Sequence, residues 1–147
     1  PGNASLDLVV KALDTTKMAA YDDFTIKKYL DVNALSGFTK TSSGLYYKIA
    51  DAGSLSPITV DSTVSAEYTG KLLNGVVFDK AVAGSPATFS LSGVIKGWKE
   101  AIPLLKQGGT IRMILPSALA YGFEGSSGSI PPFSCLDFNV KITDVKQ

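Results

Sequence analysis

The hydrophobic residues of this 147-residue chain change their spacing at about Gly44. Before that point they recur with the period of a helix. Near the start, four apolar residues have the spacing i, i+3, i+4, i+7 that forms one helical face: Leu6, Val9, Val10 and Leu13. A second helix is predicted to begin with a cap at Asp22 or Asp23 and to end before Gly37. The pattern therefore predicts a helical N-terminal extension over residues 1–43.

From Gly44 to the end of the chain the period is two, which is typical of strands. The predicted strands cover residues 45–49, 64–73, 76–78, 110–115 and 136–145. Asn74 and Gly75 separate two of them and predict a hairpin with a type I′ turn, which needs positive φ at both positions. In the last strand, Leu136, Phe138, Val140 and Ile142 alternate as apolar residues. Asp137 and the residues that alternate with it are therefore expected on an exposed face.

Two further segments complete the predicted fold. A short amphipathic helix is expected over residues 99–105, opening near Lys96 and limited in length by Pro103. Residues 121–132 form a loop rich in glycine and serine that ends in Ile-Pro-Pro. The predicted fold class is α+β, with an antiparallel sheet packed on one short helix and long loops at one end.

Composition places the chain among globular proteins and excludes several partners. The chain is 45% hydrophobic and 18% charged, which is typical of a folded domain. Its 14 basic and 13 acidic residues give a net charge of +1 and are spread along the chain. Neither nucleic acid nor an anionic membrane surface is therefore an expected partner.

The rarity of some residue types limits the possible chemistry. The chain has no histidine, which excludes Ser-His-Asp and Cys-His catalysis and any site with histidine ligands to a metal. Its one cysteine, Cys135, excludes an internal disulfide and a zinc cluster and is expected to be a small buried residue. We therefore expect no metal and no cofactor, and any reaction must use carboxylates, hydroxyls, amines, backbone or shape.

Aromatic residues also gather where strands end and loops begin. A pocket lined by such rings and by a few hydroxyl donors is the expected form of a small-molecule or peptide site. The alternative is that the rings simply fill the core, which applies most to Phe89 and Phe138. It applies less to Trp98, Tyr68 and Tyr121, because a phenol group is poorly accommodated in a purely apolar interior.

Five short motifs follow one another between residues 66 and 132: AEYTG at 66–70, GVVFD at 75–79, VIKGW at 94–98, AYG at 120–122 and IPP at 130–132. Each motif alone is weak, but their order and spacing resemble the FK506-binding protein (FKBP) family of peptidyl-prolyl cis/trans isomerases. Residues 87–98 are most similar to bacterial members that carry helical N-terminal extensions. The resemblance implies an antiparallel half-barrel sheet wrapped on one short helix, with an isomerase domain over residues 44–147.

The resemblance also implies a hydrophobic pocket with Trp98 as its floor. It assigns the following residues to the walls of the pocket or to ligand binding: Tyr68, Phe78, Phe89, Val94, Ile95, Ile130 and Phe138. The backbone N–H of Ile95 and the hydroxyl of Tyr121 would donate hydrogen bonds to carbonyl groups of the substrate or of a macrolide. Asp79 would be a polar acceptor at the rim. Such a site rotates X-Pro bonds without covalent or acid–base chemistry.

Three positions depart from the pattern of the family. Ala87 stands where many members have an aromatic residue, and Ser129 stands where a loop residue often packs beside Ile130. The first departure is expected to open one wall of the pocket and to affect macrolide affinity more than the fold. Glu67 replaces a residue that is frequently histidine, which fits a reaction that needs no imidazole.

The resemblance implies proline-containing peptides and unfolded proteins as substrates and FK506-like macrolides as ligands. It implies a bacterial protein of the periplasm or one tethered to a membrane by lipid. Two alternatives stay open: a non-catalytic, peptide-binding chaperone module of the same fold, and a docking domain in which the extension has the main role. The apolar face of residues 6–13 is expected to form a homodimer or to pack on its own domain.

Overall fold

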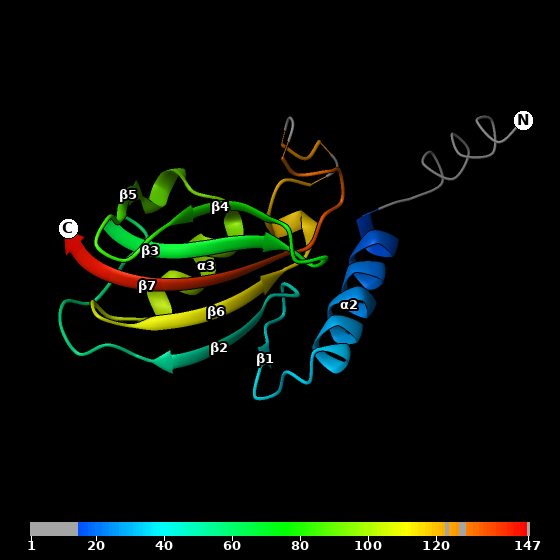
Figure 1. Ribbon diagram of the computed structural model, residues 1–147, viewed down its shortest axis with the longest axis horizontal. Coiled ribbons are helices and arrows are strands. Elements are labelled where there is room, and N and C mark those ends of the chain that lie inside the picture. Colours follow the sequence, from blue (N-terminus) through cyan, green and yellow to red (C-terminus); the bar gives the residue numbers. More distant parts are fainter. Residues whose placement is uncertain (1–14, 123, 127–128, 147) are drawn as a thin grey trace, which may run out of the picture.

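The computed structural model describes residues 15–122, 124–126 and 129–146, which form a curved antiparallel sheet around a short helix (Figure 1). The sheet has seven strands: β1 (Thr39–Lys40), β2 (Tyr46–Asp51), β3 (Thr63–Leu72), β4 (Val77–Ala81), β5 (Ala87–Ser90), β6 (Thr110–Leu115) and β7 (Leu136–Lys146). Their order is β1-β2-β6-β7-β3-β4, and β5 also pairs with β3. The expected α+β class and open antiparallel sheet are confirmed.

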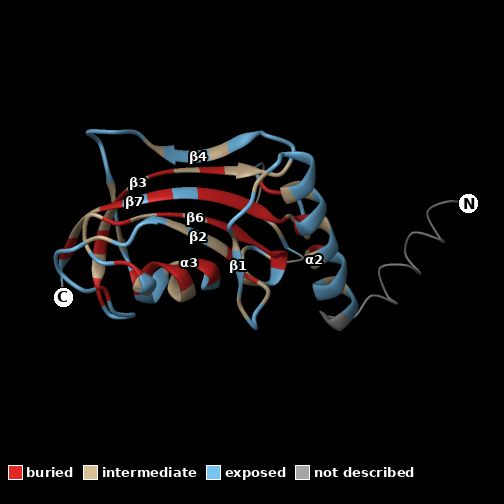
Figure 2. Cartoon of the chain, turned by 90° about the horizontal axis from the view of Figure 1, so that it is seen from below, coloured by how far each residue is buried: buried red, intermediate tan, exposed pale blue. Residues whose placement is uncertain are grey.

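The two described α-helices contact different parts of the sheet. α2 (Thr15–Val32) runs beside one end, and α3 (Lys96–Ala101) lies against the concave face (Figures 1 and 2). Three short 3₁₀ helices adjoin these elements: η1 (Leu91–Gly93), η2 (Ile102–Leu104) and η3 (Ser117–Leu119). Within the described residues, no helix has both the length and the apolar character needed to cross a membrane.

The main core lies between the concave face of the sheet and α3. Alternate residues of β3 from Val64 to Gly70 are buried, as the period of two predicts. They pair with the buried positions of β7, where Tyr68 lies opposite Val140 and Gly70 lies opposite Phe138. Burial of each large apolar side chain stabilises the fold by about 1.5–3 kcal/mol, so these two strands contribute much of the stability.

The other face of the sheet is not wholly exposed, and the expectation for Asp137 is wrong. Asp137 is only 1% exposed, because α2 covers this end of the sheet. Its carboxylate accepts hydrogen bonds from Nε and Nη2 of Arg112, at 3.1 and 2.7 Å, and from the hydroxyl of Tyr29 at 2.6 Å. Around this ion pair, Ile26 of α2 packs with Tyr46 and other side chains in a second, smaller core.

The predicted start of the second helix is also wrong, because the described part of α2 already runs from Thr15 through Asp22 and Asp23. Neither carboxylate caps a helix. Asp22 contacts Ser117, and Asp23 accepts one hydrogen bond from Tyr46 and forms ion pairs with Lys40 and Lys27. These tertiary contacts satisfy the two acidic groups in mid-helix. The predicted apolar face of residues 6–13 lies outside the described residues.

α2 ends at Val32, which is earlier than the position of Gly37 predicts. The helix end is a Schellman-type motif that contains no glycine. The N–H of Leu35 donates to the carbonyl of Leu30 at 2.8 Å, and the N–H of Ala34 donates to that of Asp31 at 3.1 Å. This arrangement places Ala34 at φ 54°, in the left-handed region that normally selects glycine.

The turn between β3 and β4 differs from the expected type I′ turn. Ala34 and Phe133 are the only described residues other than glycine with positive φ, so Asn74 does not adopt it. Gly75 has φ 93°, and its N–H donates to the carbonyl of Leu72 at 3.0 Å. The turn is therefore a type I turn followed by a left-handed glycine, which is the usual three-residue hairpin.

Ala34→Gly should stabilise the protein by about 0.5–1 kcal/mol, because it removes the steric cost of a Cβ in the left-handed region. The free energy of unfolding in urea measures this effect. Ala20→Gly, an exposed substitution inside α2, is the matched control and should destabilise by about 1 kcal/mol. Equal destabilisation by both substitutions would contradict the strained helix end.

Asp23 should give the fold a dependence on acid pH. Burial raises the pKa of this carboxyl, but hydrogen bonds from Tyr46, Lys40 and Lys27 outweigh that effect and lower it to about 2. An unfolded aspartate titrates near 3.9, so the stabilisation is present above pH 4 and is lost as the pH falls towards 2. Thermal unfolding of the wild type and of Asp23→Asn should show a difference in stability that shrinks over this range. A difference in stability between the two proteins that stays constant between pH 4 and pH 2 would refute the prediction.

Candidate functional site

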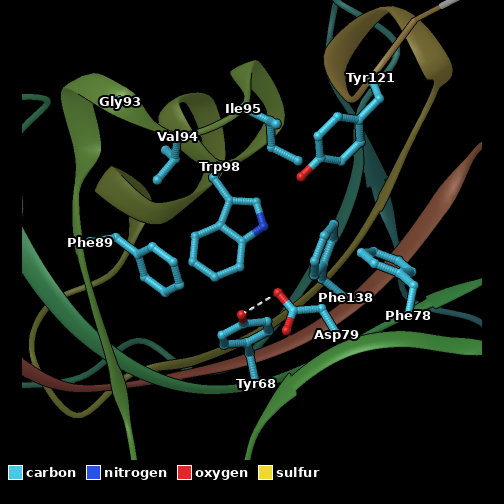
Figure 3. Close-up of a pocket in the computed structure, with 10 residues that line it drawn as sticks. All are labelled: Tyr68, Phe78, Asp79, Phe89, Gly93, Val94, Ile95, Trp98, Tyr121 and Phe138. Atoms are coloured by element: carbon cyan, nitrogen blue, oxygen red, sulfur yellow. Dashed lines mark hydrogen bonds between the residues drawn. The ribbon is translucent and has the colours of Figure 1, made fainter. Parts of the chain in front are cut away.

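A pocket of about 290 Å³ opens between the concave face of the sheet and α3 (Figure 3). Strands, the segment before α3, α3 itself and the turn after η3 all contribute to it. Its lining consists of Tyr68, Phe78, Asp79, Phe89, Gly93, Val94, Ile95, Trp98, Tyr121 and Phe138. Six of these ten residues are aromatic, so the pocket is mainly apolar, with polar groups from a few side chains.

Trp98 forms the base of the pocket and is only 4% exposed. Three rings meet it edge to face, with centroid distances of 5.3 Å to Tyr68, 5.4 Å to Phe89 and 5.5 Å to Phe138. Such aromatic pairs contribute about 0.5–1.5 kcal/mol each beyond the burial of their surface. The indole is therefore held rigidly by its neighbours, with one part facing the cavity.

Two glycines of the motifs allow this packing. A Cβ on Gly97 would lie 2.2 Å from Cδ2 of Leu115, so only glycine lets α3 approach β6 so closely. A Cβ on Gly70 would lie 2.6 Å from Cε1 of Phe138 and 2.8 Å from Cζ of Phe78. The glycines of the VIKGW and AEYTG motifs thus have a packing role in bringing the rings to the pocket.

Tyr68 and Asp79 form the best-defined polar contact of the pocket. The hydroxyl of Tyr68 donates to Oδ2 of Asp79 at 2.5 Å (Figure 3). Burial and this hydrogen bond raise the pKa of Tyr68, so the phenol stays protonated at neutral pH. Asp79, from β4, lies exposed at the rim and serves as an acceptor for Tyr68.

Tyr121 approaches the pocket from the opposite side, and its hydroxyl points into the cavity near Ile95 (Figure 3). It follows η3 and is 39% exposed. Burial, and then the negative charge of Asp79, raise the pKa of Tyr121. The phenol is therefore a hydrogen-bond donor that is accessible to a ligand. Ile95 caps the start of α3 and turns its carbonyl towards the helix, where it accepts from Trp98 at 3.1 Å.

The structure brings nine of the ten predicted site residues to this pocket, and Ile130 is the exception. Ile130 is 5% exposed and belongs to the core cluster that also contains Trp98. Two hydrogen bonds with Ser126, at 2.8 and 2.9 Å, set the backbone here, and the side chain is buried. Ile130 is therefore not among the residues that line this pocket, and its role in ligand binding stays a prediction.

Gly93 lines the pocket but was not predicted, because a glycine has no side chain that would signal a site. Ala87 is not part of the lining. It pairs with Ala66 at the edge of β3, and Phe89, two residues later on the same strand, supplies the ring on this side.

The arrangement determines which chemistry the pocket can support. Among the described residues, no three cysteine, aspartate or glutamate side chains are grouped so that they would hold a metal ion. The polar groups on the side chains of the lining are one carboxylate, two phenols and one indole N–H, and no amine is among them. The pocket is suited to bind an apolar group against Trp98 while a hydroxyl holds a neighbouring carbonyl oxygen.

Comparison with known proteins agrees with this geometry. Residues 56–143 match the family model of FKBP-type peptidyl-prolyl cis-trans isomerases. A probable FKBP-type peptidyl-prolyl cis-trans isomerase of Haemophilus influenzae is 49% identical over 106 residues, which are 71% of this chain and 44% of that protein. Outer membrane protein MIP of Legionella longbeachae is 44% identical over 112 residues, covering 76% of this chain and 48% of the relative. The chain thus spans about half the length of these relatives.

A solved structure has the same fold. The crystal structure of FkpA from Escherichia coli superposes with a TM-score of 0.76 at 36% identity, covering 99% of this chain and 70% of that one. The family match covers more than half of the chain and includes the elements that form the pocket. The chain therefore belongs to the family of FKBP-type peptidyl-prolyl cis-trans isomerases.

Proposed function

We propose that the protein catalyses the cis/trans isomerisation of X-Pro bonds in peptides and unfolded proteins. The observation that carries the proposal is the apolar pocket on Trp98, which has a protonated phenol, Tyr121, aimed into it. A proline ring is compact and apolar and fits against an indole, and the carbonyl groups next to it are acceptors for a hydroxyl. Membership of the family and the names of the relatives support the same activity.

The reaction needs no acid or base, because no covalent bond is broken. Rotation about the peptide bond is opposed by amide resonance, with a barrier of about 18–20 kcal/mol. An X-Pro bond has nearly balanced isomers that interconvert over tens to hundreds of seconds. Acceleration by four to five decades requires about 6 kcal/mol of stabilisation of the transition state relative to the free reactants.

The pocket can provide this stabilisation through desolvation and orientation. The planar amide is strongly dipolar and well hydrated, whereas the twisted amide has lost resonance and much of its dipole. An apolar cavity that removes water therefore favours the twisted state. Trp98 would hold the proline ring, and Tyr121 and the Ile95 N–H would hold a carbonyl, which fixes the axis of rotation. Asp79 would hold the hydroxyl of Tyr68 in one orientation and would not act as a base.

The non-catalytic chaperone reading is not favoured, because the relatives are named isomerases. Binding of FK506-like macrolides is proposed on the same pocket, which has an apolar floor and an exposed donor. An exported location in the bacterial envelope is also proposed, and the name of the Legionella relative supports it. Fractionation of the source cells would test this location, and recovery with the cytoplasmic proteins would contradict it.

We further propose that residues 1–43 form an extension that joins two copies of the chain. Three large apolar side chains of α2 support this, since Tyr21, Phe24 and Val32 are 66%, 66% and 74% exposed. Sedimentation equilibrium should give a dimer for the full chain and a weaker dimer for Phe24→Ser. Val60→Ser, which changes an exposed apolar residue far from α2 in sequence, is the control. A monomeric wild type would contradict the proposal.

Tyr121→Phe should lower kcat/KM by about threefold to tenfold, because it removes one hydrogen bond to the substrate, worth about 0.5–1.5 kcal/mol. The rate of cis-to-trans conversion of a short X-Pro peptide, with and without FK506, measures this change. Tyr21→Phe, at an exposed position of α2, is the control and should have the activity of the wild type. No acceleration by folded wild-type protein would favour a binding module over an enzyme.

A further inference from the structure

The helix of the N-terminal extension is connected by hydrogen bonds to the turn that carries Tyr121. Asp22 lies in the middle of α2 and is only 2% exposed. Its Oδ2 accepts two hydrogen bonds from Ser117, one from the backbone N–H at 2.9 Å and one from Oγ at 2.5 Å. Ser117 is also 2% exposed and is the first residue of η3. The contact therefore joins a buried charge on one element to the start of another.

Ser117 in turn holds both neighbours of Tyr121. Its carbonyl accepts the N–H of Ala120 at 3.0 Å and the N–H of Gly122 at 2.9 Å. Tyr121 itself is 39% exposed, so its place over the pocket depends largely on the backbone on either side of it. A shift of Ser117 would move both of these hydrogen bonds and thus the phenol between them.

We infer that Asp22 is a positioning residue for the isomerase reaction, which acts through Ser117 to place the hydroxyl of Tyr121 over the pocket. This inference rests on the proposed function, since it assumes that Tyr121 binds the substrate. It assigns to the extension a part in the geometry of the site, although α2 contributes no residue to the lining of the pocket.

The environment of Asp22 makes the contact costly to lose. A buried carboxylate is tolerated only when it is hydrogen-bonded, and its hydrogen bonds are stronger than neutral ones. Both partners of this contact are buried, because Asp22 and Ser117 are each only 2% exposed. Without Asp22, the N–H and Oγ of Ser117 would lose their partner, and this turn would adjust to recover one.

Asp22 is not the only contact that holds α2 on the domain. Ile26 packs in the smaller core, and the hydroxyl of Tyr29 donates to Asp137 on β7 at 2.6 Å. The Tyr29 contact is a partly buried hydrogen bond to a buried carboxylate, and it connects α2 to the sheet and not to η3. Tyr29→Phe therefore weakens the attachment of α2 without touching the turn, which makes it a matched control for Asp22→Ala.

The experiment compares kcat and KM of the wild type, Asp22→Ala, Tyr29→Phe and Tyr121→Phe on a short X-Pro peptide. It is run well below the unfolding temperature, and circular dichroism verifies that each variant is folded. Asp22→Ala should lower kcat/KM by about twofold to fivefold, which is part of the effect of one hydrogen bond. Tyr29→Phe should leave it unchanged. In the Tyr121→Phe background, Asp22→Ala should cause no further loss, because the two residues act on one interaction.

Two results would overturn the inference: unchanged activity of Asp22→Ala, or an equal loss with and without the Tyr121 hydroxyl. If Asp22→Ala does not fold, Ser117→Ala replaces it. This variant removes only the Oγ donor and should show about a twofold loss that disappears in the Tyr121→Phe background.

Hydrogen exchange provides a readout that does not depend on activity. The amides of Ala120 and Gly122 should exchange faster in Asp22→Ala and at the wild-type rate in Tyr29→Phe. Unchanged exchange at both amides in Asp22→Ala would refute the connection even in an active enzyme. Faster exchange in a protein without isomerase activity would refute the proposed function and the positioning role, while the structural link from α2 to the turn would stand.

Discussion

The packing of Trp98 between α3 and the curved sheet is the constraint on which the site depends. Three rings surround the indole edge to face, and each ring comes from a different strand. The sheet must therefore curve around α3 for all of them to meet. Gly97 and Gly70 allow this approach, since a Cβ at either position would overlap its neighbours. The pocket is the side of this aromatic cluster that other core side chains do not cover.

The same strands have a different chemistry on their other face. Phe138 of β7 forms a wall of the pocket, whereas the residue before it, Asp137, points to the opposite face and binds Arg112 and Tyr29. A strand places successive side chains on opposite faces, so the pocket and the attachment of α2 are only one residue apart. The Asp137 carboxylate accepts hydrogen bonds from both Arg112 of β6 and Tyr29 of α2, which joins the helix to two strands of the sheet. The extension is thus docked in a defined position on the back of the strand that lines the site.

Most of the domain could be predicted from the sequence, because local patterns determine it. The period of two in residues 136–145 predicted β7, and the family resemblance carried by the motifs predicted nine residues of the pocket, seven of which lie in the motifs themselves. Two of the errors have a common cause, which is contact between segments that are distant in sequence. Asp137 is buried because α2 covers it, and Asp22 lies in mid-helix because Ser117 satisfies it. Neither partner can be identified from the spacing of residues along one segment.

The loop after β6 shows why the residues of a site are easier to predict than the contacts that position them. The family resemblance carried by the AYG motif predicts a tyrosine at the pocket, and the hydroxyl of Tyr121 points into the cavity. What holds this tyrosine is a series of hydrogen bonds from α2 through Ser117, in which 95 residues separate the first two members. Since the side chain of Tyr121 is partly exposed, packing alone does not determine its position. A group that binds substrate through one hydrogen bond gains most when its backbone is fixed beforehand, because ordering it during binding would cost free energy. A short helical extension that buries one carboxylate against this turn supplies that order outside the pocket, where it leaves the cavity free for the substrate.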